Sequence, residues 1–492
     1  MFNLFKIEKK MKKKILLFVC AILCAGAMSA QVGEPLCFTA LENGSSVTLK
    51  KSGSAPIPSN MYYKINDGAP VAFSLSSTSY SFPVLANAGD KLYVYTESET
   101  LQATGKSSSG SAVYWYFTYT GSLNVSGDVT TLIKKGGNVL DISSKTYALT
   151  HLFSQTNEKD NRDILKSANE LVLPSTTLSQ SCYSAMFEYN TSLEYGPAEL
   201  PATVINANTP YFQMFRDCSS LKSSPIIRAT SITASTATTT MGQMFMRCNN
   251  LNRIVVNFKS WQAITGDKDT GFDTWVSNVA GSGTFICPVG FPTGKTGSNF
   301  IPSGWTVQPS AFLDVPACGW ASVCYDKAVE IPTGVKAYYA TSIDENKVVL
   351  AECEGVIPAN QGVMVNAAQG VVPFIIKESS SYSIINKFVG TTTGTTVSEN
   401  TVYVLNAGKS TADRPVLSLF TGTSIPANKA YLTAPASSEG KLEVVFADEP
   451  TGIENIAPAM VETKSMYNLQ GIRVNQNYNG IVIMNGKKYL VK

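Results

Sequence analysis

His151 is the only histidine of the 492-residue chain, so it is the one side chain that exchanges a proton near neutral pH without an unusual environment. Nucleophilic catalysis by serine or cysteine usually needs such a base beside the nucleophile. No Gly-x-Ser-x-Gly motif or other matching nucleophile accompanies His151. One histidine also excludes a histidine-rich zinc site. We therefore interpret His151 as a capping or surface residue and predict no catalytic residue.

Acidic residues offer two further kinds of chemistry. Asp267, Asp269 and Asp273 surround Gly271, and alternating aspartates can converge on a calcium ion. The segment lacks a third alternating aspartate before the glycine and a distant glutamate, so we expect a solvated surface loop. Glycosidases position two carboxylates through their fold and not through local spacing, and nothing in the sequence marks such a pair. We expect no enzyme, no metal site and no cofactor.

The residues with regular spacing belong to one phrase that is written three times between residues 182 and 251. Each copy contains a Met–Phe pair, and successive pairs are 28 and then 30 residues apart: Met186–Phe187, Met214–Phe215 and Met244–Phe245. A leucine closes each copy, at Leu193, Leu221 and Leu251. A period of this length predicts stacked units that bury their apolar faces against each other. We assign the Met–Phe pairs to this shared core in preference to a ligand pocket.

A small polar residue occupies one position in all three copies, as Asn190, Cys218 and Cys248. This is the asparagine-or-cysteine position of leucine-rich repeats, where a small polar group can cap the backbone of the adjoining turn. A disulfide or a metal pair between the two cysteines is the alternative. The asparagine in the same column favours the capping role.

Each closing leucine leads into a short extended segment, in which alternate residues face opposite sides of a sheet. The set expected to face the core is small or branched: Gly196, Ala198, Ser224, Ile226, Ile254 and Val256. The set expected to face outward is the candidate binding surface: Tyr195, Glu199, Ser223, Ile227, Arg253 and Asn257. Stacked strands of this kind present an extended face that suits a protein ligand.

Taken together, these motifs resemble the BspA-type leucine-rich repeat surface proteins of Bacteroidetes bacteria. The segment Cys182–Leu193 (CYSAMFEYNTSL) is similar to the hallmark phrase of that family, and Leu200–Thr203 (LPAT) to the phrase that follows it. Pro210 and Thr240 replace the first cysteine in the later copies. The likeness covers roughly residues 130–308. It implies a leucine-rich repeat fold and a non-catalytic adhesin that binds proteins of host or bacterial surfaces.

The first 30 residues read as a secretory signal peptide. The basic segment Lys12–Lys14 precedes the apolar segment Ile15–Cys24, and we place the cleavage site after Ala30, in preference to a lipid anchor. The six lysines and one glutamate of this leader leave 33 of 39 basic and 35 of 36 acidic residues. This near-neutral balance gives no footprint for nucleic acid, and no other apolar run is long enough to span a bilayer. We expect secretion and association with the cell surface at the outer membrane.

Short runs of Val, Ile, Tyr and Phe between turn residues predict a mainly β chain. We expect an N-terminal β-sandwich at residues 31–128, a leucine-rich-repeat-like solenoid at 129–308, a second, accessory β-sandwich at 309–448, and a linker with a C-terminal hairpin tail at 449–492. The tail resembles the sorting tails of type IX secretion cargo. The eight cysteines after the leader are too widely spread for a small disulfide scaffold, and Cys324 with Cys353 is the candidate pair.

Two other functions compete with adhesion. A carbohydrate-binding accessory protein needs an exposed row of aromatic rings on the flanking β domains, for which Tyr114, Tyr116 and Trp320 are the candidates. The strand Tyr114–Tyr119 is aromatic on both faces, and the simpler interpretation is a core strand of a sandwich. A purely structural envelope protein needs no dedicated ligand at all.

Overall fold

The computed structural model describes residues 33–447 with short gaps, together with parts of the C-terminal tail. The gaps are residues 57, 76–77, 109–110, 159–161, 234–239, 262–269, 345, 379–383 and 436–438, and the tail is described at 454–455, 466–469, 473–474, 478, 480–484 and 487–491. The predicted leader and two aspartates of the predicted acidic loop, Asp267 and Asp269, lie outside the described residues.

The described part of the chain is mainly β, as predicted, with several sheets, one of which is nearly closed into a barrel. It contains no α-helix, and its two 3-10 turns are η1 (Val129–Leu132) and η2 (Thr270–Phe272). Within these residues no helix has the length and apolar character that a membrane crossing requires.

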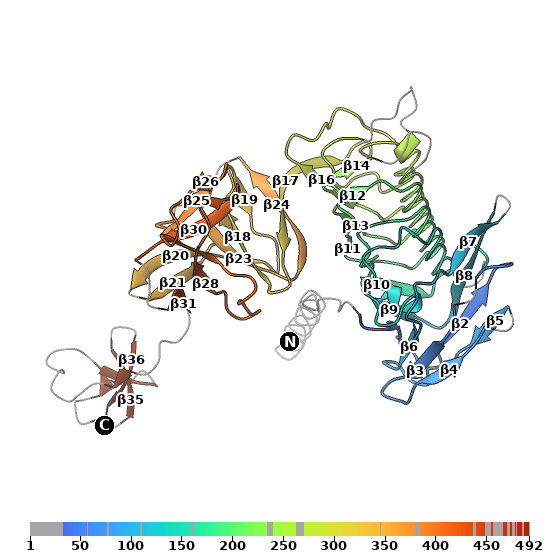
Figure 1. Ribbon diagram of the computed structural model, residues 1–492, viewed down its shortest axis with the longest axis horizontal. Coiled ribbons are helices and arrows are strands. Elements are labelled where there is room, and N and C mark those ends of the chain that lie inside the picture. The colour runs from blue at the N-terminus through green and yellow to red at the C-terminus, as the bar shows by residue number, and fades with distance from the viewer. Residues whose placement is uncertain are drawn as a thin grey trace, which may run out of the picture.

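Two sheets form the N-terminal part of the fold, at one end of the stacked turns in Figure 1. A six-stranded sheet has the order β10-β9-β1-β6-β3-β4, and a four-stranded sheet has the order β5-β2-β8-β7. Their strands are β1 (Leu36–Ala40), β2 (Ser46–Lys51), β3 (Met61–Ile65), β4 (Val71–Phe73), β5 (Ser79–Ser81), β6 (Lys91–Thr96), β7 (Gly105–Ser108), β8 (Ser111–Thr120), β9 (Leu123–Asp128) and β10 (Leu165–Val172). Inward aromatic and branched side chains of both sheets, among them Phe38 and Phe117, make one core.

The three copies of the repeated phrase lie directly on one another, and we call residues 182–288 the repeat stack. Its strands pair in parallel, each copy with the next: β11 (Glu199–Leu200), β13 (Ser223–Ile227), β15 (Arg253–Val256) and β16 (Thr284–Pro288). β17 (Thr306–Val315) continues the same sheet, while β12 (Val204–Ile205) and β14 (Ser231–Ile232) form a second short parallel pair.

The Met–Phe turns join through a ladder of backbone hydrogen bonds. The N–H of Phe187 donates to the carbonyl of Met214 over 2.8 Å, and that of Phe215 donates to Met244 over 2.9 Å. Ala185 and Tyr189, four residues apart, adopt left-handed backbone conformations with φ of 52° and 65°. Such a conformation costs a non-glycine residue about 1–2 kcal/mol. It recurs at the equivalent positions of the later copies, where the same ladder offsets this cost: Gln213, Asp217, Gln243 and Arg247.

A column of aromatic rings runs through the middle of the stack. Phe187 lies 5.3 Å from Phe215, and Phe215 lies 5.7 Å from Phe245, with the rings nearly parallel. Phe153 extends the column on one side, at 5.2 Å from Phe187. Trp275 ends it on the other side beside Trp261. The predicted core role of the phenylalanines is confirmed, because these rings are fully buried.

The polar column caps this aromatic column. The Asn190 amide donates to the carbonyls of Phe153 and Phe187, over 2.8 and 2.9 Å. The Cys218 thiol donates to Phe187, and the Cys248 thiol to Phe215, each over 3.0 Å. The predicted capping role is therefore confirmed. Burial raises the pKa of Cys218 and of Cys248 far above the ordinary thiol value, so both remain neutral donors.

One hydrophobic core runs without interruption from Leu36 in β1 to Trp305, the residue before β17. The N-terminal sheets and the repeat stack therefore pack as a single body, joined by the parallel pair β9–β10. The predicted boundary between residues 128 and 129 falls at the end of β9, and the one between 308 and 309 falls within β17. Both boundaries stay predictions.

A second β unit follows β17, to the side of the repeat stack in Figure 1. β24 pairs with β17 on one side and with β19 on the other, and β22 pairs with β19. Nine further strands form the sheet β18-β23-β20-β21-β31-β28-β27-β30-β25. The bounds are β18 (Trp320–Val323), β19 (Ala328–Glu330), β20 (Lys336–Asp344), β21 (Lys347–Glu352), β22 (Val356–Ile357), β23 (Val363–Asn366), β24 (Gly370–Lys377), β25 (Phe388–Thr391), β26 (Thr395–Thr396), β27 (Val402–Leu405), β28 (Leu417–Leu419), β29 (Ser424–Ile425), β30 (Lys429–Thr433) and β31 (Lys441–Phe446). One apolar cluster contains side chains of both sheets, and a second contains side chains of the nine-stranded sheet.

The described tail forms a small sheet of its own, in the order β32-β36-β35-β33-β34. Its strands are β32 (Glu454–Asn455), β33 (Met466–Asn468), β34 (Arg473–Val474), β35 (Gly480–Met484) and β36 (Lys487–Val491). β35 and β36 pair antiparallel around positions 485–486. The predicted C-terminal hairpin is therefore present, as part of a larger sheet.

Candidate binding surface and adjoining cavity

Three of the six residues predicted for the binding surface lie side by side in one row. Tyr195, Ser223 and Arg253 occupy matching positions on neighbouring parallel segments, so their side chains leave the sheet on the same face. The same register adds hydroxyl-bearing residues at both ends of this outward row, which reads in full Ser167, Tyr195, Ser223, Arg253, Thr284 and Thr306. The row is a line of hydroxyl groups with one guanidinium near its middle.

Arg253 lacks a carboxylate partner in the part of the chain that the structure describes. Its Nη1 donates to the Ser223 hydroxyl over 3.4 Å, and burial lowers the pKa of the guanidinium because it removes water from the charged form. A partly buried cation without an anion is costly. An anionic group supplied from outside would reduce that cost, so Arg253 is the strongest single attraction for a ligand on this row.

Tyr195 provides an open aromatic surface in the same row, two segments away from Arg253. Its side chain is 44% exposed, and the Lys222 amine lies 5.2 Å from the centre of its ring while it also pairs with Glu194. Ser223 stands between Tyr195 and Arg253 and is much smaller than either. The row therefore presents an aromatic ring on one side of Ser223 and, on the other side, a guanidinium that donates to the Ser223 hydroxyl.

The structure contradicts the predicted orientation of Ile227, which is fully buried and faces the core. The cause is one extra residue in β13. Ser223 pairs with Arg253, but the next paired residue, Ile226, already meets Val255. The Ser224 hydroxyl fills the interrupted ladder by accepting the Val255 N–H over 3.0 Å. Such a bulge moves every later side chain of the strand to the opposite face.

The predicted inward set also differs from the structure at two positions, Ala198 and Ile226. Leu200, Ile227 and Val256 form the inward column at this end of the strands. Ala198, which we expected inside, is exposed. Ile226, also expected inside, stands in register with Glu199 on the outward side.

Glu199 and Asn257 lie away from the row and gather around Arg228. Arg228 Nη1 donates to Glu199 Oε1 over 3.3 Å, and Nη2 donates to Asp314 Oδ2 over 2.6 Å. Glu199 Oε2 also accepts the N–H of Val371, and the Asn257 amide donates to the Arg228 carbonyl. This end of the predicted surface is therefore covered by β17 and β24 of the same chain.

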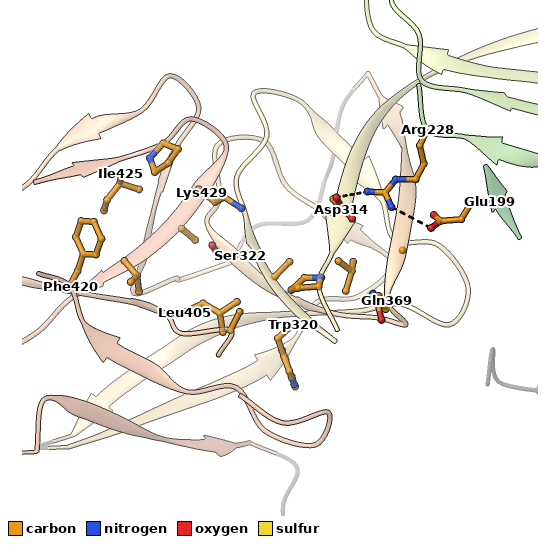
Figure 2. A pocket seen from close by; sticks show the side chains of 18 residues that line it. Glu199, Arg228, Asp314, Trp320, Ser322, Gln369, Leu405, Phe420, Ile425 and Lys429 are labelled. Atoms are coloured by element: carbon orange, nitrogen blue, oxygen red, sulfur yellow. Dashed lines mark hydrogen bonds and ion pairs between the residues drawn. The ribbon is translucent and has the colours of Figure 1, made fainter. Parts of the chain in front are cut away.

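A cavity of about 620 Å³ opens where the repeat stack meets the second β unit. Figure 2 shows Glu199, Arg228 and Asp314 on one wall, and Leu405, Phe420, Ile425 and Lys429 on the opposite side. Its size lies within the usual range for small-molecule sites. The remaining lining residues are Val315, Pro316, Trp320, Ala321, Ser322, Gln369, Gly370, Val404, Ala407, Pro426 and Ala430.

The aromatic row that a carbohydrate site would need is absent at the predicted positions. Tyr114 and Tyr116 are 8% exposed and Trp320 is 2% exposed. Their apolar surroundings explain this: Tyr114 stacks on His151, and Trp320 packs against Phe446 in the core of the second β unit. These three rings cannot serve as a sugar platform, so the carbohydrate alternative loses its candidate residues, and the burial of Tyr114 and Tyr116 agrees with the simpler interpretation of a core strand.

His151 lies flat against Tyr114, with ring centres 4.0 Å apart. Its Nδ1 atom is buried and has no hydrogen-bond partner. Burial lowers the pKa of His151 from 6.5 to about 4, because the charged ring would lose its water. His151 is therefore a packed, neutral residue at the beginning of the stacked turns.

We expect this histidine to make the fold sensitive to mild acid. Between pH 6.5 and 4, His151 is protonated in the unfolded chain but stays neutral in the folded chain. The free energy of unfolding therefore falls as the pH is lowered. From pH 7 to pH 5 the loss should be about 2 kcal/mol. Urea unfolding of the wild type and of His151→Phe at both pH values measures it. Equal pH dependence in the two proteins would contradict the assignment.

The described cysteines are free thiols, so the suggested Cys324–Cys353 disulfide is absent. Burial raises the pKa of Cys324 to about 11 and that of Cys353 to about 12. Both thiols are protonated and buried, which makes them poor nucleophiles. Among the described residues no group of three or more His, Cys, Asp or Glu side chains could hold a metal ion.

Of the charged residues that line the cavity, sequence reasoning named Glu199 and missed Arg228, Asp314 and Lys429. One signal was present for Arg228, because Ile227–Thr230 reads IRAT where the first copy reads LPAT, which places an arginine at the position of Pro201. Lys429 likewise follows the second copy of an Ile-Pro-Ala-Asn phrase, where the first copy has Gln361. For Asp314 no local pattern was available. In comparisons with known proteins the chain matches no family model, no curated protein and no solved structure.

Proposed function

We propose that this protein is a secreted, surface-associated binding module or adhesin, without catalytic activity, for proteins of host or bacterial surfaces. In this proposal residues 129–308 are a leucine-rich-repeat-like solenoid of the BspA type, flanked by an N-terminal β-sandwich and an accessory β-sandwich. The C-terminal tail acts as a sorting-like signal that keeps the protein at the outer membrane.

The outward row is the observation that carries this proposal. Arg253 is partly buried and has no carboxylate partner among the described residues, and it lies two segments away from the open ring of Tyr195. Aromatic and arginine side chains dominate the binding energy of many protein interfaces. A protein partner that places a carboxylate at Arg253 and an apolar group on Tyr195 would use both. The repeated turns make the row rigid, which lowers the entropic cost of binding.

Capture of labelled host-cell and bacterial surface proteins by the immobilised chain tests the proposal. The variant Arg253→Glu with Tyr195→Ala should retain partners at least about tenfold more weakly, because a repelled carboxylate and a lost ring together cost more than 1.4 kcal/mol. Lys347→Glu is the matched charge reversal, at an exposed lysine of β21 in the second β unit. It should bind like the wild type.

Unchanged capture by the double variant would remove the row from the binding site. If both variants lose capture to the same extent, binding depends on the overall charge of the chain and not on the row. Thermal unfolding of each variant should stay close to the wild type, since the mutated side chains contribute little to the core.

A further inference from the structure

The cavity between the repeat stack and the second β unit is independent of the outward row, and its walls carry opposite charges. Glu199 and Asp314 contribute two negative charges to the wall on the stack side, and Arg228 offsets one of them through its two ion pairs. Lys429 contributes one positive charge from β30. One wall is therefore net negative and the other is positive.

The two charges face each other without touching. Figure 2 shows the Lys429 amine directed into the space that separates it from Asp314 and Arg228. Among the described residues, Asp314 forms an ion pair with Arg228 alone. In the same part of the chain, Lys429 forms no ion pair with Asp314 or Glu199. Arg228 occupies Oδ2 of Asp314, which leaves Oδ1 available as an acceptor. Opposed charges held apart by an open cavity leave room for a ligand that bridges them.

The rest of the lining is largely apolar: Val315 and Pro316 follow Asp314 in the chain, and Leu405, Phe420 and Ile425 lie on the side of Lys429 (Figure 2). Ser322 and Gln369 add a hydroxyl and an amide at the edge, and such groups can exchange hydrogen bonds with a peptide backbone. A sugar would leave its hydroxyls against apolar side chains. A ligand with an apolar body and two charged ends satisfies all three parts of the lining.

We propose that this cavity binds a short apolar peptide as a zwitterion, with the terminal ammonium at Asp314 and the terminal carboxylate at Lys429. Glu199 is less free to bind the ammonium, because Arg228 and the N–H of Val371 already occupy its oxygens. The site is formed jointly by β17, β18, β27 and β30 with the stack. Binding would therefore bridge the repeat stack and the second β unit.

Isothermal titration calorimetry of the full chain with Leu-Leu-Leu tests this site. We expect the free tripeptide to bind, and its N-acetylated and C-amidated forms each to bind about tenfold more weakly, since each loses one charged contact. In Lys429→Met, amidation of the peptide should no longer weaken its binding, whereas acetylation should weaken it as in the wild type. Asp314→Asn should do the reverse, and Lys347→Met should bind as the wild type does.

Equal binding of the three peptides, or no binding by any of them, would overturn the proposal. Tighter binding of decanoate than of the tripeptide would assign the cavity to a single-chain amphiphile, and so would also overturn it. Because the peptide series is compared first on the wild type, the result does not depend on the folding of a variant. The outcome is also separate from that of the Arg253 variant, whose side chain does not line the cavity.

Discussion

Replacement of Phe215 by alanine should cost about 4 kcal/mol of unfolding free energy, the largest effect that we expect from a single change in the repeat stack. The Phe215 ring is fully buried between Phe187 and Phe245, and truncation of a buried phenylalanine typically costs 3–5 kcal/mol through lost packing and a residual cavity. The ladder of backbone bonds on both sides limits how far the turns can collapse into that space. Chemical unfolding of the purified chain measures the loss.

Tyr195→Ala is the matched control for this change. It removes an aromatic ring of similar size from the same stack, but from the exposed row, and it should change stability by no more than about 0.5 kcal/mol. A similar cost for both variants would mean that the phenylalanine column does not hold the turns together. A selective loss at Phe215 would separate the residues that build the stack from those that are free to bind.

Replacement of Asn190 by alanine should cost about 3 kcal/mol. The amide donates to two buried carbonyls, those of Phe153 and Phe187, and removal of a buried donor leaves its acceptors under-satisfied at about 1–3 kcal/mol. A small cavity adds to this cost. Denaturant unfolding gives the value, and Asn249→Ala, at an exposed asparagine of the third copy, should leave it unchanged within about 0.5 kcal/mol.

Asn190→Cys provides a sharper test of the same idea. Cys218 and Cys248 occupy the equivalent positions and donate to the equivalent carbonyls. A cysteine at position 190 should therefore recover more than half of the stability that alanine loses. If cysteine and alanine are equally destabilising, the capping interpretation of this column is wrong.

The repeats could be predicted because their information is local and periodic. The Met–Phe pairs and the Asn190–Cys218–Cys248 column follow from spacing alone, and the structure places them as that spacing requires. Tyr195, Ser223 and Arg253 were assigned correctly to one face because they come before any irregularity in their strands.

The later part of that face could not be predicted, since one inserted residue decides it. The bulge at Ser224 and Pro225 reverses the orientation of Ile227, and the sequence carries no periodic signal for a single insertion of this kind. Two distant residues cover Glu199. Asp314, about 115 positions away, reaches it through Arg228, and Val371, 172 positions away, donates to it directly. Contacts of that range follow from how the sheet curves, which local patterns do not report.

Site-specific photocrosslinking tests most directly whether the outward row is the surface that holds a partner. A photoreactive phenylalanine analogue would replace Tyr195 in one protein and Val204, an exposed residue of the separate β12–β14 sheet, in another. We predict that a captured surface protein becomes crosslinked to position 195 and not to position 204. Crosslinking at position 204 alone, or equally at both, would contradict the assignment of binding to the row around Arg253.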